Sequence, residues 1–175
     1  DSRANAIEFK LFGALRDEVK AETSTLSAIA RKVSTVDVLS SFAHHARQRS
    51  WTRPHIMDDE RLDISGARHP VLEADGRFVP NDIRFDAKRR FLLLTGPNMG
   101  GKSTYLRTCA LISILAQSGS YVPATKARLG LVDRVFTRVG AHDDLRRGRS
   151  TFMMEMIEVA HILRRATPKS LVLLD

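Results

Sequence analysis

The sequence predicts an α/β protein with a mainly parallel sheet, preceded by a helical segment. Two apolar runs predict the sheet: residues 91–94 and 171–174 are short and continuous, which is typical of strands buried on both faces. The third observation is the helical spacing of apolar residues over 102–117, directly after a glycine-rich turn. Strand, turn and helix in this order open a βα unit.

Two amphipathic helices are expected ahead of the sheet. Apolar residues recur at helical spacing over residues 6–20, and over 26–43 they alternate in steps of three and four, typical of a helix that packs along a partner. The composition changes near Trp51, where a proline and an acidic cluster follow. We therefore expect a helical segment at 1–50 and a second domain at 51–175.

The second domain is expected to alternate between short strands and helices. Its helices are expected at 102–117 and 151–166. The β structure is expected at 62–65, 71–73, 78–79, 83–85, 91–95, 127–139 and 171–175.

The composition excludes several classes of protein. With 43% hydrophobic and 27% charged residues, the 175-residue chain is neither wholly disordered nor collagen-like, and no apolar run is long enough to cross a membrane. The single cysteine, Cys109, excludes an internal disulfide, which favours a reducing cytoplasm, and its place on an apolar stripe favours a core position. The net charge of +8 gives weak support for a polyanionic ligand such as a nucleotide or nucleic acid.

Residues 96–103 match the pattern G-x-x-x-x-G-K-S in full, between the expected strand and helix. Glycines let backbone N–H groups turn inward around phosphate oxygens, and the helix adds the positive end of its dipole. Lys102 would reach the β- and γ-phosphates, and the Ser103 hydroxyl would ligate Mg²⁺. The sequence therefore predicts a binding site for a nucleoside triphosphate with Mg²⁺.

Asp175 follows the apolar run 171–174, which places its carboxylate at the C-terminal edge of the sheet beside this loop. There it would hold Mg²⁺ through water. The residue that activates the attacking water is expected just beyond Asp175. We therefore expect this stretch of chain to bind nucleotide without turning it over.

A polar loop at 140–150 leads into the helix expected at 151–166. Ser150 or Thr151 would cap that helix, whose exposed N–H groups form a second anion site. Spacing alone leaves two interpretations open: an ordinary capped helix, or the second half of a site that sandwiches nucleotide between two subunits.

Several segments together resemble one known family. They are Thr95 to Thr104 with its Pro-Asn-Met insert, Gly148 to Met153, Asp143-Asp144-Leu145 and Arg68-His69-Pro70. These segments resemble the C-terminal ATPase region of MutS mismatch-repair proteins over essentially the whole chain. The resemblance implies a P-loop NTPase sheet of the ABC-ATPase type flanked by helices, with residues 1–50 as the returning end of lever helices.

The resemblance also implies roles for single residues. Asn98 would lie near the γ-phosphate, Phe78 would stack on adenine, and Ser150 would reach across a dimer to the partner's nucleotide. Arg146-Arg147 depart from the small residues of relatives and add charge beside that site. The implied catalytic residues are Lys102, Asn98 and Ser150, the implied metal ligands are Ser103 and Asp175, and the implied ATP or ADP contacts are Phe78, Gly96, Pro97, Asn98, Met99, Gly100, Gly101, Lys102, Ser103 and Thr104.

The function that the resemblance implies is a DNA-dependent ATPase that couples nucleotide state, in a dimeric composite site, to mismatched double-stranded DNA. A homodimer, a downstream partner of the MutL type and association with the bacterial nucleoid are implied with it. Two alternatives stay open: a MutS relative acting in recombination or on branched DNA, and a nucleotide-binding dimerisation module without turnover. A small-molecule kinase is disfavoured because its phosphate loop leaves the segment around Ser150 and the leading helices unexplained.

Overall fold

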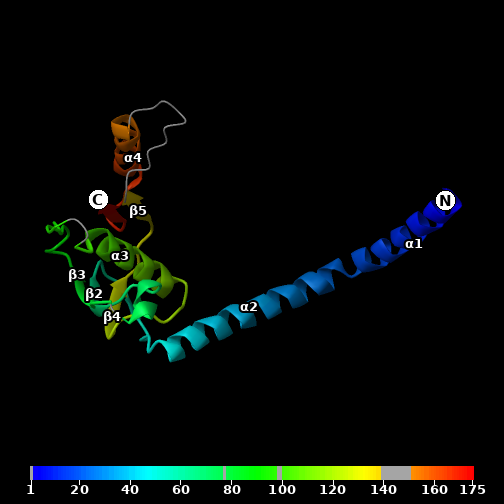
Figure 1. Ribbon diagram of the computed structural model, residues 1–175, viewed down its shortest axis with the longest axis horizontal. Coiled ribbons are helices and arrows are strands. Elements are labelled where there is room, and N and C mark those ends of the chain that lie inside the picture. The colour runs from blue at the N-terminus through cyan, green and yellow to red at the C-terminus, as the bar shows by residue number, and fades with distance from the viewer. Residues whose placement is uncertain (1, 77, 98–99, 139–150) are drawn as a thin grey trace. The chain divides into compact units, whose positions relative to one another are not determined.

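A computed structural model of the chain describes residues 2–76, 78–97, 100–138 and 151–175 (Figure 1). By their internal contacts the residues divide into two compact units, Asp1–Phe42 and Ala43–Asp175. The domain boundary expected near residue 50 stays a prediction. None of the described helices is long and apolar enough to cross a membrane.

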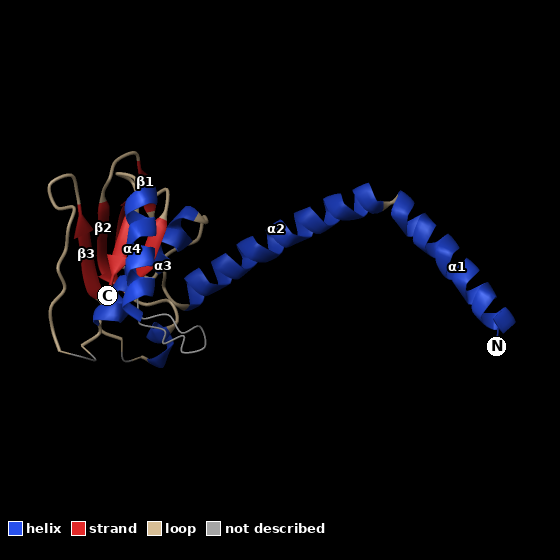
Figure 2. Cartoon of the chain, turned by 90° about the horizontal axis from the view of Figure 1, so that it is seen from above, coloured by secondary structure: helices blue, strands red, loops and turns tan. Residues whose placement is uncertain are grey.

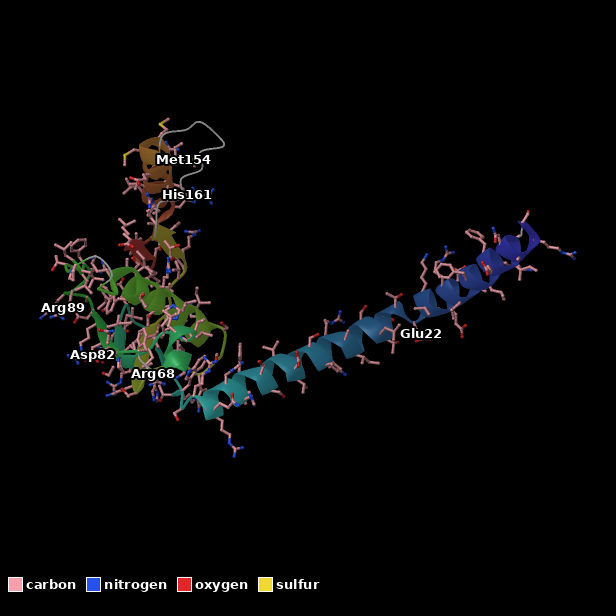
Figure 3. All side chains as sticks on the ribbon, viewed as in Figure 1. Glu22, Arg68, Asp82, Arg89, Met154 and His161 are labelled. Carbon is pink, nitrogen blue, oxygen red and sulfur yellow. The ribbon has the colours of Figure 1, made fainter. Side chains whose placement is uncertain are left out.

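The first unit consists of helix α1 (Ser2–Ala21) and most of helix α2 (Thr23–Gln48), which confirms both expected helices. Glu22, labelled in Figure 3, separates them, and the Thr23 hydroxyl donates to the carbonyl of Lys20 at 2.8 Å. No side chain described in α1 is buried. In α2, the apolar stripe from which we expected packing along a partner is also exposed within the described residues, at Leu26, Ile29, Val33 and Val36 among others.

Helix α2 ends inside the second unit with a left-handed residue. Ser50 has φ +50°, and the N–H of Trp51 donates to the carbonyl of Ala46 at 2.9 Å. This pattern is the Schellman motif, which satisfies carbonyls of the last helical turn. The motif turns the chain toward the first strand.

The larger sheet has four strands in the order β1-β4-β2-β3: β1 (His55–Met57), β2 (Leu62–Ala67), β3 (Asn81–Phe85) and β4 (Lys126–Gly130). Figure 2 labels β1, β2 and β3. Only β1 and β4 run parallel, whereas β2 is antiparallel to both β3 and β4. The expected mainly parallel sheet is thus wrong here, because β2 and β3 are joined without the helical crossover that a parallel pair needs.

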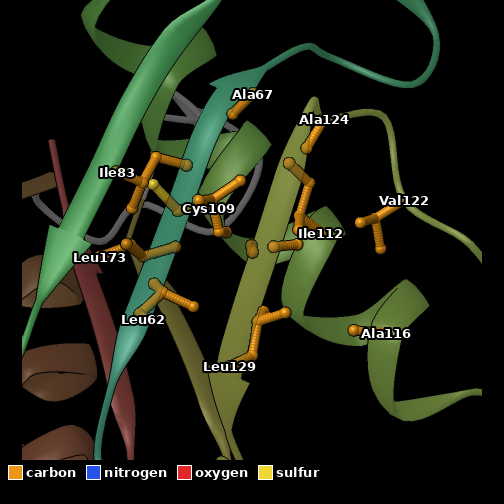
Figure 4. Close-up of a cluster of buried hydrophobic side chains, with 13 residues drawn as sticks. Leu62, Ala67, Ile83, Cys109, Ile112, Ala116, Val122, Ala124, Leu129 and Leu173 are labelled. Atoms are coloured by element: carbon orange, nitrogen blue, oxygen red, sulfur yellow. The ribbon is translucent and has the colours of Figure 1, made fainter. Parts of the chain in front are cut away.

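Helix α3 (Lys102–Gln117) begins and ends at the predicted residues and supplies much of the core. Its Cys109 and Ile112 are 1% and 0% exposed, and they belong to one cluster with Ile64 and Ile83 of the sheet (Figure 4). Burial raises the pKa of the Cys109 thiol to about 12, so the thiol stays protonated as a small core residue. The expected core position of Cys109 is confirmed.

A second sheet pairs β5 (Val135–Arg138) with β6 (Leu171–Leu174) in parallel, and helix α4 (Thr151–Arg165) lies between them in sequence. Arg138 bridges to Glu155 and, at 3.1 Å from Nε, to Glu158, so both carboxylates of α4 hold one guanidinium at the end of β5. The expected β stretch 127–139 is two strands, one in each sheet. The mixed α/β class is confirmed.

Three expected strands are wrong. Residues 91–95 form no strand, and Phe91 and Leu93 are 80% and 73% exposed. An apolar run encodes a preference for burial, but a strand also needs a neighbour that offers backbone donors and acceptors, and no described strand pairs with this run. Residues 78–79 also form no strand, and of residues 71–73 Val71 lies in a turn, whereas Leu72 and Glu73 begin the 3₁₀ helix η1 (Leu72–Asp75).

The turn at 71–73 has a local cause. The Nδ1 atom of His69 accepts hydrogen bonds from the N–H groups of Val71 and Leu72, at 3.2 and 3.3 Å. Those two donors are therefore satisfied within the turn and are unavailable to a sheet ladder.

Candidate nucleotide-binding site

The glycine-rich loop, which we call the phosphate loop and define as residues 96–103, turns tightly at its described residues. The N–H of Gly100 donates to the carbonyl of Pro97 at 3.1 Å, and a Cβ built on Gly100 would lie 2.9 Å from that same oxygen. Gly101 has φ +83° and directly precedes the first residue of α3. A side chain is therefore excluded at position 100 and strained at position 101.

Lys102 folds back over the phosphate loop. Its Nζ donates to the carbonyls of Gly96 and Pro97, both at 2.8 Å. The ammonium is thus held inside the curve of the loop, at the start of α3, where the N–H groups of the first helical turn point outward. One cation and several backbone donors at one place favour a bound anion.

The structure brings the two predicted metal ligands together. The Ser103 hydroxyl, in the first turn of α3, donates to Oδ2 of Asp175, which lies 72 residues further along the chain. Asp175 is placed by β6, because its N–H donates to the carbonyl of Arg138 on β5 at 2.8 Å. Helix α3 contacts β6, which explains why the two side chains meet.

The chemistry of this pair fits Mg²⁺. A hydroxyl and a carboxylate are hard oxygen donors, and Mg²⁺ is commonly held by one or two protein oxygens together with substrate phosphates and water. The same two side chains lie at the start of the helix that carries Lys102. The pair therefore suits a cation that also contacts phosphate.

Phe78 is half-buried and packs against His69, with 6.5 Å between ring centroids and a tilt of 48°. Burial of His69 is the main cause that lowers the pKa of this imidazole below 6.5, the charge of Arg107 lowers it further, and the Glu73 carboxylate opposes the shift. Arg107 lies one turn after Ser103 on α3. The Phe78 segment is therefore linked through His69 to the helix that carries the phosphate loop.

Some predicted site residues lie outside the described residues. They are Asn98 and Met99 of the phosphate loop and Ser150 before α4. Helix α4 begins at Thr151, where the sequence predicted a helix. The roles of Asn98 and Ser150 stay predictions.

Sequence reasoning missed two supports of this region. The Tyr105 hydroxyl donates to the carbonyl of Asp82 at 3.0 Å, which fastens α3 to β3, and burial raises the pKa of Tyr105 to about 12. The second support is a partly buried ion pair between Arg68 and Glu73, at 2.7 Å. Tyr105 was visible as part of an apolar stripe, but nothing in the local pattern indicated which carbonyl its hydroxyl would meet.

The fold is mixed α/β, and its candidate site is a glycine-rich loop at the start of a helix, with a hydroxyl–carboxylate pair beside it. Residues 92–175 match the family described as MutS domain V. Over 97% of this chain, the DNA mismatch repair protein MutS 1 of Halobacterium salinarum is 54% identical. The MutS proteins of Methanosarcina mazei and Rhodopirellula baltica are 49% and 51% identical over the whole chain.

The chain belongs to the MutS family, and it includes the domain V region of that family. It spans about a fifth of the length of the curated relatives it matches: 19% of the H. salinarum protein and 20% of each of the other two.

Proposed function

We propose that the phosphate loop, Thr104 and Asp175 bind ATP with Mg²⁺ in a DNA-dependent ATPase of the mismatch-repair type. The observation that carries the proposal is the hydrogen bond between the Ser103 hydroxyl and the Asp175 carboxylate, beside the loop that holds Lys102. The names of these relatives, DNA mismatch repair protein MutS, favour mismatch repair over a role in recombination.

In this proposal the protein acts by positioning and by electrostatics. Lys102 exchanges its two loop carbonyls for phosphate oxygens, and the backbone N–H groups of the loop and of the first turn of α3 bind the remaining phosphate oxygens. Ser103 and Asp175 would hold Mg²⁺, which would supply positive charge beside the β- and γ-phosphates. Water then displaces ADP from the γ-phosphorus, and inorganic phosphate is released.

The remaining predicted residues complete the site. Phe78 stacks on the adenine, because a flat aromatic ring binds a base through its face. Asn98 contacts the γ-phosphate, and Ser150 is supplied to the nucleotide of the second subunit in a homodimer. The binding of mismatched double-stranded DNA and of a partner of the MutL type depends on the nucleotide state of this dimer.

The test is steady-state ATP hydrolysis by the full-length protein without DNA, with paired duplex and with a single-mismatch duplex. We expect a rate that changes with the mismatch and that Lys102→Ala abolishes, since the variant removes the phosphate-binding cation. Lys169→Ala is the matched control, because Lys169 is exposed and lies outside the proposed site. Unchanged ATP affinity in Lys102→Ala would disprove the proposal.

Two other results would select the alternatives. A rate that responds to branched DNA and ignores mismatches would indicate the recombination role. ATP-linked association in sedimentation without any hydrolysis would indicate a nucleotide-binding dimerisation module.

A further inference from the structure

A buried carboxylate lies at the centre of a cluster outside the phosphate loop. Glu73, in η1, has a side chain only 8% exposed. Its Oε1 accepts a hydrogen bond from Nε1 of Trp51 at 2.6 Å, and its Oε2 accepts one from Nε of Arg68 at 2.7 Å. We call Trp51, Arg68 and Glu73 the Glu73 cluster; Arg68 is labelled in Figure 3.

The Glu73 cluster joins two stretches of backbone within the second unit. Arg68 Nη2 donates to the carbonyls of Arg49 and Ser50, at 3.2 and 3.4 Å. In return, Arg49 donates to the carbonyl of Pro70. The Trp51 ring also stacks on His45, near the end of α2, at 6.4 Å between centroids. The end of α2 and the turn at 68–73 are therefore held together by charged and aromatic contacts.

The same turn leads to Phe78. His69 lies between Arg68 and Glu73 in sequence, and the N–H of Glu73 donates to the carbonyl of His69 at 2.9 Å. His69 is 7% exposed, and its ring packs against the ring of Phe78. A displacement of Glu73 would therefore be passed to His69, and from His69 to the aromatic ring that we assign to the base.

We infer that Glu73 is a positioning residue for the base side of the nucleotide site, acting through His69 on Phe78. The inference rests on the proposed function. Glu73 contacts no residue of the phosphate loop in any described hydrogen bond or ion pair, so its effect is confined to the part of the ligand that carries the base. The cluster also makes the base contact depend on the end of α2.

The test compares two ligands that share phosphates and differ in the base: ATP and inorganic tripolyphosphate, each with Mg²⁺. The measurement is the dissociation constant of each ligand for the full-length protein and for Glu73→Gln. The variant keeps the shape of the side chain and removes the charge that holds Arg68. We expect the affinity for ATP to fall about fivefold, which corresponds to part of the binding free energy of one base–aromatic stack. The affinity for tripolyphosphate should stay unchanged.

Three further variants make the result decisive. Phe78→Ala should show the same selective loss for ATP, and Glu60→Gln should show none, because Glu60 also pairs with an arginine, Arg90, but is 39% exposed at another surface. Trp51→Phe removes the Nε1–H donor to Glu73, replaces the indole by a smaller aromatic ring, and should weaken the binding of ATP alone, to a smaller extent. It tests the same inference if Glu73→Gln does not fold.

The outcomes separate the inference from the proposed function. Equal losses for both ligands, or a loss of thermal stability with an unchanged ratio of the two affinities, would show a merely structural role and overturn the inference. A selective loss in Phe78→Ala that is absent from Glu73→Gln and Trp51→Phe would overturn the inference and leave the nucleotide site standing. If the unmodified protein bound neither ligand, the proposed function and this inference would both fail.

Discussion

The first turn of helix α3 carries polar side chains that contact the phosphate loop and Asp175, whereas its middle and end carry side chains packed in the core. Lys102 and Ser103 are half-buried, and they donate hydrogen bonds to the carbonyl of Gly96 and to the carboxylate of Asp175. Cys109, Ile112 and Ala116 are 5% exposed or less and form part of the apolar cluster. The same helix thus carries residues of the candidate site in its first turn and, further along, the core residues that hold the helix in place.

This difference shows that the residues of a binding motif are positioned by residues outside it. Tyr105 lies at the border between the two parts of α3, and its hydroxyl bond to the Asp82 carbonyl fixes the helix against β3. The core side chains set where the helix starts, and the start of the helix sets where the phosphate loop lies. Changes in the two parts should therefore have different consequences for stability and for binding.

The largest expected effect is on the core side. Ile112→Ala removes a fully buried side chain and should lower the free energy of unfolding by about 3 kcal/mol, through lost transfer free energy and a residual cavity. Urea unfolding measures this change. The nucleotide affinity of the folded fraction should stay close to that of the unmodified protein, because the helix start keeps its backbone.

Ile114→Ala on the same helix is the matched control, since Ile114 is 50% exposed. Its effect should be within about 1 kcal/mol. Equal losses for Ile112→Ala and Ile114→Ala would contradict the division of α3 into a packed part and a site-bearing part.

The sequence predicted the elements whose signals are local. The helix at 102–117 has apolar periodicity, a glycine before it and a glycine after it, and its bounds agree with the structure. The run 171–174 likewise formed the predicted strand. The sequence also predicted that Asp175 lies beside the phosphate loop, and Asp175 accepts a hydrogen bond from Ser103 there, although the strand expected before that loop is wrong.

The errors arose where structure depends on a partner segment. The run 91–95 has the composition of a buried strand, but composition does not say which strand pairs with it. The turn at 71–73 is decided by His69, whose Nδ1 accepts two backbone N–H bonds. The Glu73 cluster joins residues 22 positions apart in sequence, a separation at which no periodic pattern indicates contact.

A smaller effect is expected where the phosphate loop meets α3. Gly101→Ala should destabilise the protein by about 1 kcal/mol, because an L-residue at φ +83° is strained although nothing lies within 4 Å of the added Cβ. Gly13→Ala is the control: Gly13 is helical in α1 with open space around it, so alanine should stabilise by up to about 1 kcal/mol. Thermal unfolding measures both, and changes of the same sign would contradict the left-handed conformation of Gly101.

The smallest expected effect is a dependence of stability on pH that comes from His69, beside the middle of α3. Its folded pKa is lowered below 6.5 by burial and by Arg107, so above pH 6.5 the imidazole is neutral in both states and the full stability is present. As the pH falls below 6.5, the unfolded chain takes up the proton first, and stability is lost down to the lowered folded pKa. Protonation of the folded chain would also remove the Nδ1 lone pair that accepts the Val71 and Leu72 N–H groups.

Urea unfolding between pH 7.5 and 5.5 measures this dependence. His69→Asn is the informative variant, because an amide oxygen can take the place of Nδ1 as acceptor and does not titrate. We expect the variant to lose less stability than the unmodified protein over this range, while the two differ little in slope above pH 7. Identical pH profiles would show that the surroundings of His69 do not hold it neutral. The charge of Arg107 would then have no measurable effect on the imidazole that packs against Phe78.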